Sequence, residues 1–322
     1  MAERQASRVL SCLSVPPDTP NAVPADVQQL RGIATEPPGL IFERVEATSI
    51  LERSAAASLP FTWMLNPYVN CEFDCQYCFR RDAPDLLGAS EYPHQDGHIL
   101  IKSNAADLLR ESLQQRSYRG ETIAMGTATD PYQPAEERAG VTRSLLRVFA
   151  EFSDLALTVT TKSTLVTRDL DLLTEIASRN SLYVNVTVTT TDSVLARKLE
   201  PNAPAPAARF EALRKVCAAG LQARVFCMPL MPGVNDGEES LRAVFAQALD
   251  AGAIDVGAAP LYMPASVRAV FGSWLRNTCP ALDGSFQQHF GEDGAILEPE
   301  KTRLAAVVGS LRREFGFPRY HR

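Results

Sequence analysis

From residue 61 onward, short runs of apolar and β-branched residues alternate with longer amphipathic stretches. Within the amphipathic stretches, apolar residues recur three and four positions apart, as Leu213, Val216 and Cys217 do. This alternation predicts βα units that build a parallel sheet. The predicted strands span residues 61–65, 122–125, 156–161, 182–189, 223–228 and 254–258, and the predicted helices between them span 105–116, 136–152, 169–178, 206–219 and 238–251.

Six strands with intervening helices favour one barrel, partial or full, over two separate domains. Beyond Pro264 the pattern is helical, with segments at residues 267–277, 285–290 and 299–314. Before residue 58, prolines interrupt any periodicity and predict irregular structure. We therefore predict an α/β chain in three parts: an irregular N-terminal segment (1–58), a partial (βα)6 barrel (59–262) and a helical C-terminal extension (263–322).

Two of the predicted strands are apolar on one face and polar on the other. Side chains alternate across a strand, so the strand at 182–189 places valines 184, 186 and 188 opposite Asn185, Thr187 and Thr189. The strand at 156–161 likewise separates Leu157 and Val159 from Thr158, Thr160 and the following Lys162. A parallel sheet covered by helices on both sides would be apolar on both faces. One polar face predicts a barrel whose interior holds a polar ligand.

The composition is typical of a folded soluble protein, with 322 residues, 45% hydrophobic and 22% charged. A formal net charge of −6 argues against binding nucleic acid by bulk electrostatics, although a local basic groove stays open. No apolar stretch approaches the roughly 20 residues of a membrane helix. The first residues lack the apolar core of a secretory signal, so we expect a cytoplasmic location.

Three of the seven cysteines lie close together in the sequence, directly after the first predicted strand: Cys71, Cys75 and Cys78. Thiolates select zinc, copper(I) or iron–sulfur clusters. Iron–sulfur clusters usually take four cysteines, so three would leave one iron open, as a catalyst needs. The alternative is a zinc site completed by His94 or His98, although no second pair of ligands with zinc spacing is present.

The spacing Cys71-x3-Cys75-x2-Cys78, with Tyr77 before the last cysteine, resembles the signature of the radical S-adenosylmethionine (SAM) superfamily. Further segments are similar to the spore photoproduct lyase-like branch of that superfamily, including its actinobacterial-type members. These segments are Asn66-Pro-Tyr68, the stretch 126–134, the stretch 199–204 and the stretch 229–236. The resemblance covers residues 59–262 and implies the radical SAM form of the partial barrel.

The resemblance implies a [4Fe–4S] cluster held by Cys71, Cys75 and Cys78, with SAM chelating the fourth iron. It also implies reductive cleavage of SAM, a 5′-deoxyadenosyl radical that abstracts a substrate hydrogen, and a reductant such as flavodoxin or ferredoxin. The protein would supply orientation and a dry site.

The resemblance also implies a set of SAM contacts on the polar strand face. Lys162 would bind the SAM carboxylate and Tyr77 would contact the adenine, while Gly126 would let the SAM amino group approach the backbone. Asn185 and Thr187 are alternative candidates for the ribose or the carboxylate. The remaining predicted positions are Thr129 as a hydroxyl contact to SAM, Arg209 as a further carboxylate contact, and Tyr262, after the sixth strand, as a catalytic residue facing the substrate.

One departure from the family pattern concerns the substrate. Photoproduct lyases carry a hydrogen-donating cysteine where this chain has Thr127, and a threonine O–H bond is too strong for that role. Cys227 does not replace it, because it shares its face with Val225 and should face the helices. We therefore expect a small-molecule or nucleotide-type substrate. The alternatives are a DNA-lesion lyase, with nucleic acid as the less favoured partner, and a non-catalytic zinc or iron–sulfur protein.

Overall fold

The computed structural model describes residues 39–54, 59–78, 97–115 and 120–318. The larger of its two sheets has seven strands in the order β10-β9-β8-β7-β6-β3-β2. Neighbours from β3 to β10 pair in parallel, and β2 pairs antiparallel with β3. The strands are β2 (Leu51–Arg53), β3 (Trp63–Leu65), β6 (Ile123–Met125), β7 (Ala156–Thr161), β8 (Ser181–Thr187), β9 (Gln222–Leu230) and β10 (Asp255–Pro260).

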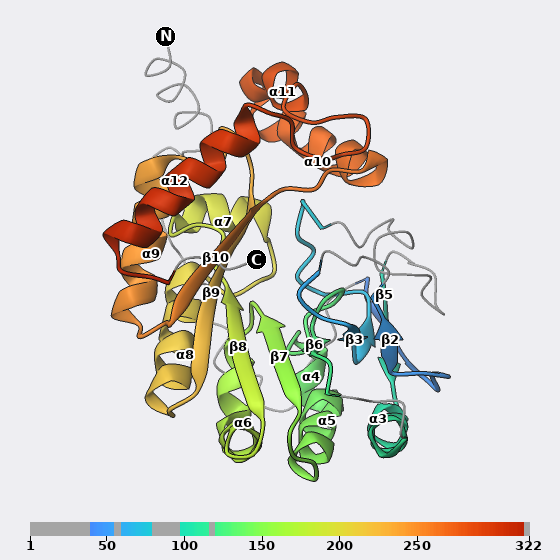
Figure 1. Cartoon of the computed structure of the whole chain (residues 1–322). Helices are drawn as coiled ribbons and strands as arrows, with labels where there is room; N and C mark the ends of the chain where they lie inside the picture. The colour runs from blue at the N-terminus through green and yellow to red at the C-terminus, as the bar shows by residue number, and fades with distance from the viewer. Residues whose placement is uncertain (1–38, 55–58, 79–96, 116–119, 319–322) are drawn as a thin grey trace, which may run out of the picture.

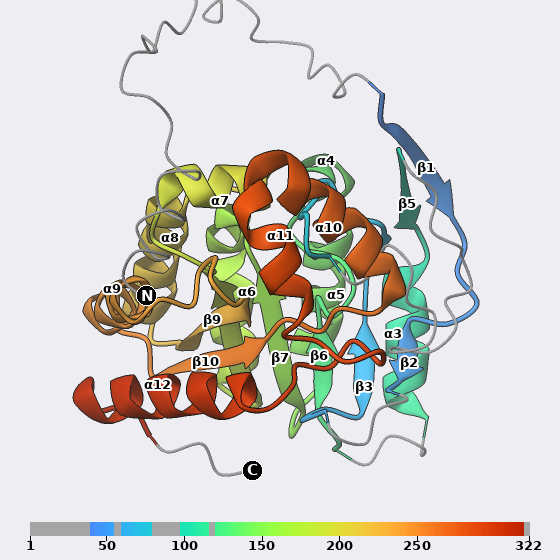
Figure 2. The same cartoon turned by 90° about the horizontal axis from the view of Figure 1, so that it is seen from above.

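The six parallel strands confirm the predicted α/β architecture. Each overlaps a predicted strand, and within the described residues β10 and β2 do not pair with each other, so the barrel is partial. The intervening helices run along one side of the curved sheet (Figures 1 and 2). They are α3 (Ala105–Gln114), α4 (Ala135–Ala139), α5 (Val141–Ala150), α6 (Leu170–Ala177), α7 (Ser193–Leu199), α8 (Pro206–Ala218) and α9 (Glu238–Asp250), with a 3-10 segment at Thr164–Asp169.

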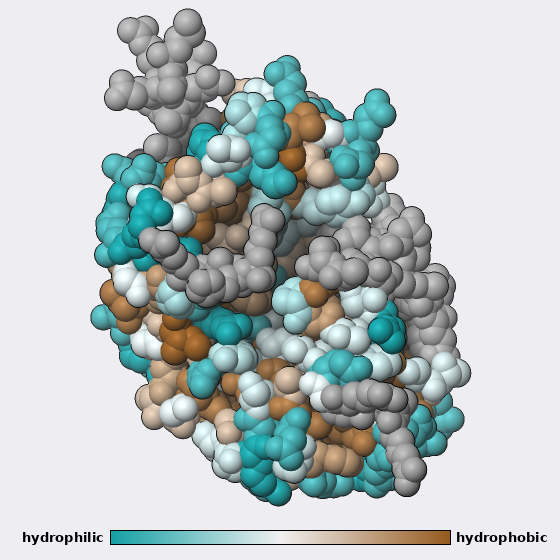
Figure 3. Space-filling view, in the orientation of Figure 1, coloured by the Kyte–Doolittle hydropathy of each residue, from teal (hydrophilic) through white to brown (hydrophobic). Residues whose placement is uncertain are grey.

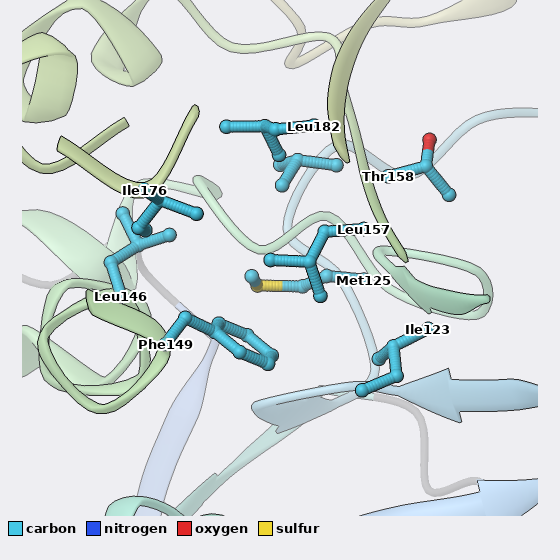
Figure 4. A pocket seen from close by; sticks show the side chains of 9 residues that line it. Ile123, Met125, Leu146, Phe149, Leu157, Thr158, Ile176 and Leu182 are labelled. Carbon is cyan, nitrogen blue, oxygen red and sulfur yellow. The ribbon is translucent and has the colours of Figure 1, made fainter. Parts of the chain in front are cut away.

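The helix-facing side of the sheet is the apolar core of the molecule. Val184, Val186 and Val225 are fully buried there, and Cys227 joins them as predicted from its parity. Figure 4 shows a small cavity on this side of β6, β7 and β8, lined almost entirely by apolar side chains of the strands and of α5 and α6. With Thr158 as its only polar lining residue, this cavity is a packing gap and not a ligand site.

A second sheet has the order β1-β5-β4, with β1 (Ile41–Val45), β4 (Tyr68–Val69) and β5 (His98–Lys102). Strands β1 and β2 correct the prediction that residues 1–58 are irregular throughout. Both are short and largely solvent-accessible, and their pairing partners β5 and β3 come later in the chain, so local periodicity gave no signal. Residues 1–38 lie outside the described part.

Three helices follow the last strand, as the sequence predicted: α10 (Ala265–Thr278), α11 (Pro280–Gln287) and α12 (Glu300–Glu314). Helices α10 and α11 lie across the end of the barrel where the parallel strands finish (Figure 1). Helix α12 packs along β10 and α9. From α12, Arg312 donates to the carbonyl of Val256 and pairs with Asp255 at 2.6 Å, both on edge strand β10. Among the described residues, no helix has both the length and the apolar character to cross a membrane.

Candidate active site

The loop that carries the three cysteines follows β4 directly. Asn70 and Asp74 have φ values of 66° and 49°, so the loop turns tightly on either side of Cys71. Cys75 is buried, and Cys71 and Cys78 are half-buried. The Cys78 amide donates to the Cys75 carbonyl at 3.1 Å, which closes the last turn of the loop.

The loop is fastened to the stretch that follows β6. Gln133, fully buried, accepts from the Glu72 amide at 2.9 Å and donates to the Asn70 carbonyl at 3.1 Å. The Glu72 carboxylate in turn accepts from the Ala135 amide at 2.5 Å. These bonds hold the backbone on both sides of Cys71.

A second attachment comes from the segment after β8. The Gln76 amide donates to the Leu199 carbonyl at 2.9 Å, and the Asn202 side-chain amide donates to the Glu72 carbonyl at 2.9 Å. The apolar side of the loop packs with α7, α10 and α11 through residues such as Phe73, Leu199 and Phe271. The segments singled out in the sequence at 126–134 and 199–204 therefore meet at the cysteine loop.

Glu200 is a buried acceptor beside this loop that the sequence analysis did not identify. Its carboxylate accepts from the Tyr77 hydroxyl and from Thr189 at 3.2 Å, and pairs with Arg209 at 2.5 Å. Burial would raise the pKa of Glu200, but the positive charges of Arg209 and Lys162 outweigh burial and lower it. Glu200 is therefore a carboxylate that links three elements of the site.

Arg209 was predicted as a SAM contact, and the structure places it elsewhere in the network. Its side chain is 1% exposed, pairs with Glu200, and donates to the carbonyls of Pro204 at 2.6 Å and Thr187 at 3.1 Å. The protein itself occupies these donors, so Arg209 positions the 199–204 segment and the end of β8. Its predicted contact to the SAM carboxylate stays a prediction.

Lys162 lies at the end of β7 with its ammonium over the Tyr77 ring, 5.7 Å from the ring centre. Burial opposes its charge, but the thiolate of Cys75 and the carboxylate of Glu200 outweigh burial and raise its pKa. Within the described part of the chain, the ammonium makes no hydrogen bond or ion pair. Asp130 accepts from the Lys162 amide at 2.7 Å and thereby fixes the backbone that presents it.

Gly126 is required for a reason the sequence did not reveal. Its φ is +86°, and an added Cβ would lie 2.3 Å from the Thr160 carbonyl oxygen and 2.7 Å from Pro131. The glycine therefore lets the loop after β6 pass against β7. The predicted approach of the SAM amino group to Gly126 stays untested.

Asn66 anchors the same loop. Its side-chain oxygen accepts from the Ala128 amide at 2.9 Å and the Thr129 amide at 3.3 Å, and its nitrogen donates to the Thr127 hydroxyl at 3.1 Å. Thr129 is buried and its hydroxyl donates to the Tyr68 carbonyl at 3.3 Å. Thr127 and Thr129 thus hold the loop next to the cysteines.

The polar strand face lies opposite the apolar core, as predicted. Asn185 is 1% exposed and donates to the hydroxyls of Thr158 at 2.5 Å and Thr160 at 3.1 Å. Its side-chain oxygen has no hydrogen-bond partner in the part of the chain that the structure describes. Thr187 is buried two residues further along β8. Figure 1 looks onto this concave face, and Figure 3 shows a hollow near its centre with both hydrophilic and hydrophobic residues at its border.

Tyr262 follows β10 and is 38% exposed. It makes no hydrogen bond within the described residues, and its side chain lies outside the buried cluster that includes Leu261 and Met263. Its predicted role toward the substrate stays a prediction.

The chemistry of the cysteine loop can be tested against the predicted cluster. Burial raises the pKa of Cys71, and Asp130 and Cys75 raise it further; burial also raises the pKa of Cys75 to about 12, against the effect of Lys162. Thiolate ligands at these positions therefore need a strongly positive centre. The three thiols share one loop and one apolar wall, which fits a multi-iron cluster in which each cysteine binds its own iron.

The zinc alternative makes a different demand on geometry. Its ligands would have to converge on one point at about 2.0–2.3 Å. In the described ranges, no group of three or more His, Cys, Asp or Glu side chains is arranged to hold one ion. His98 lies on β5, where its carbonyl accepts from Asn70, and His94 is outside the described residues.

Comparison with known proteins gives the same family as the cysteine motif. The model of the radical SAM superfamily matches residues 65–244. An uncharacterised protein of Mycobacterium tuberculosis is 33% identical over 280 residues, which cover 85% of this chain and 82% of that protein. An uncharacterised protein of Methanocaldococcus jannaschii is 27% identical over 176 residues, which cover 55% of this chain and 63% of that protein.

Among solved structures, the fold is similar to that of a spore photoproduct lyase mutant with bound AdoMet and dinucleoside spore photoproduct. The TM-score is 0.64 at 16% sequence identity, and the match covers 89% of this chain and 85% of that chain. At this identity the match concerns the fold.

Proposed function

The chain belongs to the radical SAM superfamily and is an enzyme of that class, and from this premise we propose that it abstracts hydrogen from a small-molecule or nucleotide-type substrate. Enzymes of this superfamily use a [4Fe–4S] cluster and SAM. We assign the cluster to Cys71, Cys75 and Cys78 and SAM to the adjoining end of the polar strand face. When bound, the cluster supplies the electron that cleaves SAM to methionine and a 5′-deoxyadenosyl radical.

The observation that carries this assignment is the unpaired ammonium of Lys162 beside the cysteine loop. Glu200 acts on the half-buried ammonium only through its charge and makes no ion pair with it among the described residues, so a carboxylate such as that of SAM is the direct partner it lacks. Asp130 holds the Lys162 backbone and Tyr77 holds the side chain, so the ammonium is positioned in advance. Asn185 offers an unpartnered acceptor for a ligand hydroxyl group.

The protein's own contribution is orientation and exclusion of water. Helices α10 and α11 and the side chains of Phe73 and Phe271 cover the apolar side of the loop. Such a wall keeps water and stray hydrogen donors away from a reactive radical. Thr129, Thr187 and Tyr262 are proposed to complete the contacts to SAM and substrate, and flavodoxin or ferredoxin is the proposed class of reductant.

A DNA-lesion lyase is the second candidate, because the fold resembles spore photoproduct lyase. Thr127 argues against it. Its hydroxyl is bonded to Asn66 and has no chemistry equivalent to a hydrogen-donating thiol. A gel-shift titration separates the two candidates, since a lesion-binding enzyme loses DNA affinity steeply as salt rises, whereas a small-molecule enzyme shows no shift.

The proposed function is tested by anaerobic reconstitution with iron and sulfide, followed by reduction with dithionite in the presence of SAM. The wild-type protein should become brown and form 5′-deoxyadenosine. Cys78→Ala should abolish product formation, while Cys217→Ala, which removes a free cysteine on α8, should leave it intact. One zinc per chain with no iron and no SAM cleavage would instead support the non-catalytic alternative.

A further inference from the structure

Arg224 lies on the concave face of β9, in the interior of the partial barrel. Its neighbours Ala223 and Val225 are both fully buried in the helix-facing core, so the Arg224 side chain lies on the opposite face. In the sheet it pairs with Asn185 on one side and Asp255 on the other. Arg224 is therefore part of the same polar surface as Asn185.

Among the described residues, no carboxylate pairs with the guanidinium of Arg224. It stacks on Tyr183, with its central carbon 3.7 Å from the ring centre, and its Nε is buried without a hydrogen-bond partner. Within the described residues it makes no side-chain hydrogen bond or ion pair. The nearest candidate in the sheet, Asp255, already pairs with Arg312 at 2.6 Å.

Three other buried or half-buried arginines are paired with carboxylates. Arg209 pairs with Glu200, Arg168 with Glu136 and Asp169, and Arg312 with Asp255. A half-buried guanidinium without an anion loses solvation with no compensating charge, and stacking on an aromatic ring offsets only part of that loss. The stack also fixes the plane of the guanidinium, so its free N–H groups are held in advance for a planar or tetrahedral anion.

The surroundings of Arg224 suit a ligand with an anionic group and an apolar part. The unpartnered oxygen of Asn185 lies in the adjacent sheet position. Two residues further along β9, Phe226 packs over Gly257, whose absent Cβ would lie 3.1 Å from the ring. The row of Phe226, Thr187 and Lys162 is about 7 Å from Arg224 along the strands, so both rows face one interior.

We propose that Arg224 binds the anionic group, a carboxylate or phosphate, of the substrate on which the radical acts. The claim that the bound anion belongs to the substrate rests on the proposed function. The existence of the anion site does not depend on it. Arg224 would thereby select anionic substrates and hold them below the row that contains Lys162.

The test uses the reconstituted protein and two probes, inorganic phosphate and acetate, each balanced with sodium chloride to constant ionic strength. Thermal unfolding gives an apparent dissociation constant, because a ligand at free concentration c that binds only the folded state stabilises it by RT ln(1 + c/Kd), and Tm therefore rises with ligand concentration. At least one probe should stabilise the wild-type protein, and the stronger probe identifies the class of anion. Arg224→Gln should weaken binding at least about tenfold, because it removes a charge-assisted bidentate contact.

Arg147→Gln is the matched control, since Arg147 is an exposed arginine on the outer side of α5 and should leave anion binding unchanged. Without added phosphate or acetate, Arg224→Gln should keep or raise Tm, because an unpaired guanidinium is removed. A purely structural arginine would lower it. Arg224→Lys keeps the positive charge and replaces Arg224→Gln in the test if that variant does not fold. It should still bind the anion, but more weakly than the wild-type protein does.

Three results would overturn the inference: no stabilisation of wild type by either probe, equal stabilisation of Arg224→Gln, or complete loss of the effect when saturating SAM is added, which would make the anion site that of SAM. Formation of 5′-deoxyadenosine is measured in parallel. An anion effect without SAM cleavage would refute the proposed function alone, and cleavage without an anion effect would refute the inference alone.

Discussion

Two regions of this molecule each hold an arginine shielded from solvent, and they differ in whether that arginine has an ionic partner. Beside the cysteine loop, Arg209 is enclosed by Glu200 and by the carbonyls of Pro204 and Thr187. On the concave strand face, Arg224 has only the Tyr183 ring, and the neighbouring Asn185 keeps an unpartnered oxygen. In the first region the arginine is paired within the protein, whereas the second region has polar groups without a partner among the described residues.

The difference separates residues that shape the site from residues that meet its ligands. Buried polar groups are normally paired, so a saturated group is explained by the fold. An unsaturated one costs stability and needs another reason to be there. By this criterion Gln133, Glu200 and Arg209 act within the scaffold, and among the described residues of the site Lys162 and Arg224 are the cations that we propose for ligand binding.

The largest expected effect comes from breaking the scaffold at Arg209. Arg209→Met leaves the Glu200 carboxylate buried without its main partner, which should lower the free energy of unfolding by about 3–5 kcal/mol. Arg214→Met, on the same helix α8, removes exposed pairs with Glu211 and Asp250 and should cost at most about 1 kcal/mol. Anaerobic urea unfolding measures both variants. Equal losses would show that Arg209 contributes no more than a surface pair.

A smaller loss is expected where the loop after β6 crosses β7. Gly126→Ala places a methyl group against the Thr160 carbonyl in a left-handed backbone, and should cost roughly 3 kcal/mol. Gly220→Ala has a similar φ of +83° with no atom within 4 Å of the new Cβ, so it should cost only about 1–2 kcal/mol. Urea unfolding of the pair isolates the steric contribution. If the two losses match, the close approach at Gly126 is not a constraint.

The smallest effects on stability are expected at two adjacent residues of β8 that lie on opposite faces of the sheet. Val184→Ala, on the helix-facing side, should lower stability by about 2 kcal/mol and leave SAM cleavage by the folded protein unchanged. Asn185→Leu loses two hydrogen bonds but removes an unpaired oxygen, so stability should change by less than about 1 kcal/mol. SAM cleavage should nevertheless fall at least about tenfold, because a ligand contact is lost. Full activity in Asn185→Leu would remove that residue from the proposed site.

The fold was predictable where local periodicity and tertiary structure agree. The six parallel strands and most helices follow from alternation and from three- and four-residue spacing. The helix predicted at 136–152 divides into α4 and α5, because Gly140 adopts φ of 65° and ends the first of them. Strands β1, β2, β4 and β5 were missed, since short strands depend on partners that lie elsewhere in the chain.

The candidate site was predictable in its residue types but not in its pairings. The cysteine spacing and the polar strand parity indicated Cys71, Lys162 and Asn185. The hydrogen bonds that hold the loop join residues 61 to 130 positions apart, and no local pattern encodes them. Glu200 could have been found, because it is the acidic residue of the 199–204 stretch that the sequence analysis had already singled out. A glutamate is rarely buried unless it is paired, so its burial there indicates a role in the site.

Helix α12 affects how the protein associates with other copies of itself. It occupies the margin of the sheet where a fully circular barrel would need another strand, and Arg312 caps a carbonyl that such a strand would otherwise bind. A shortened version ending before residue 300 would present β10 as bare backbone, ready to join the sheets of neighbouring molecules. We therefore expect helix α12 to shield β10 from pairing with other molecules, and truncated forms should purify as oligomers.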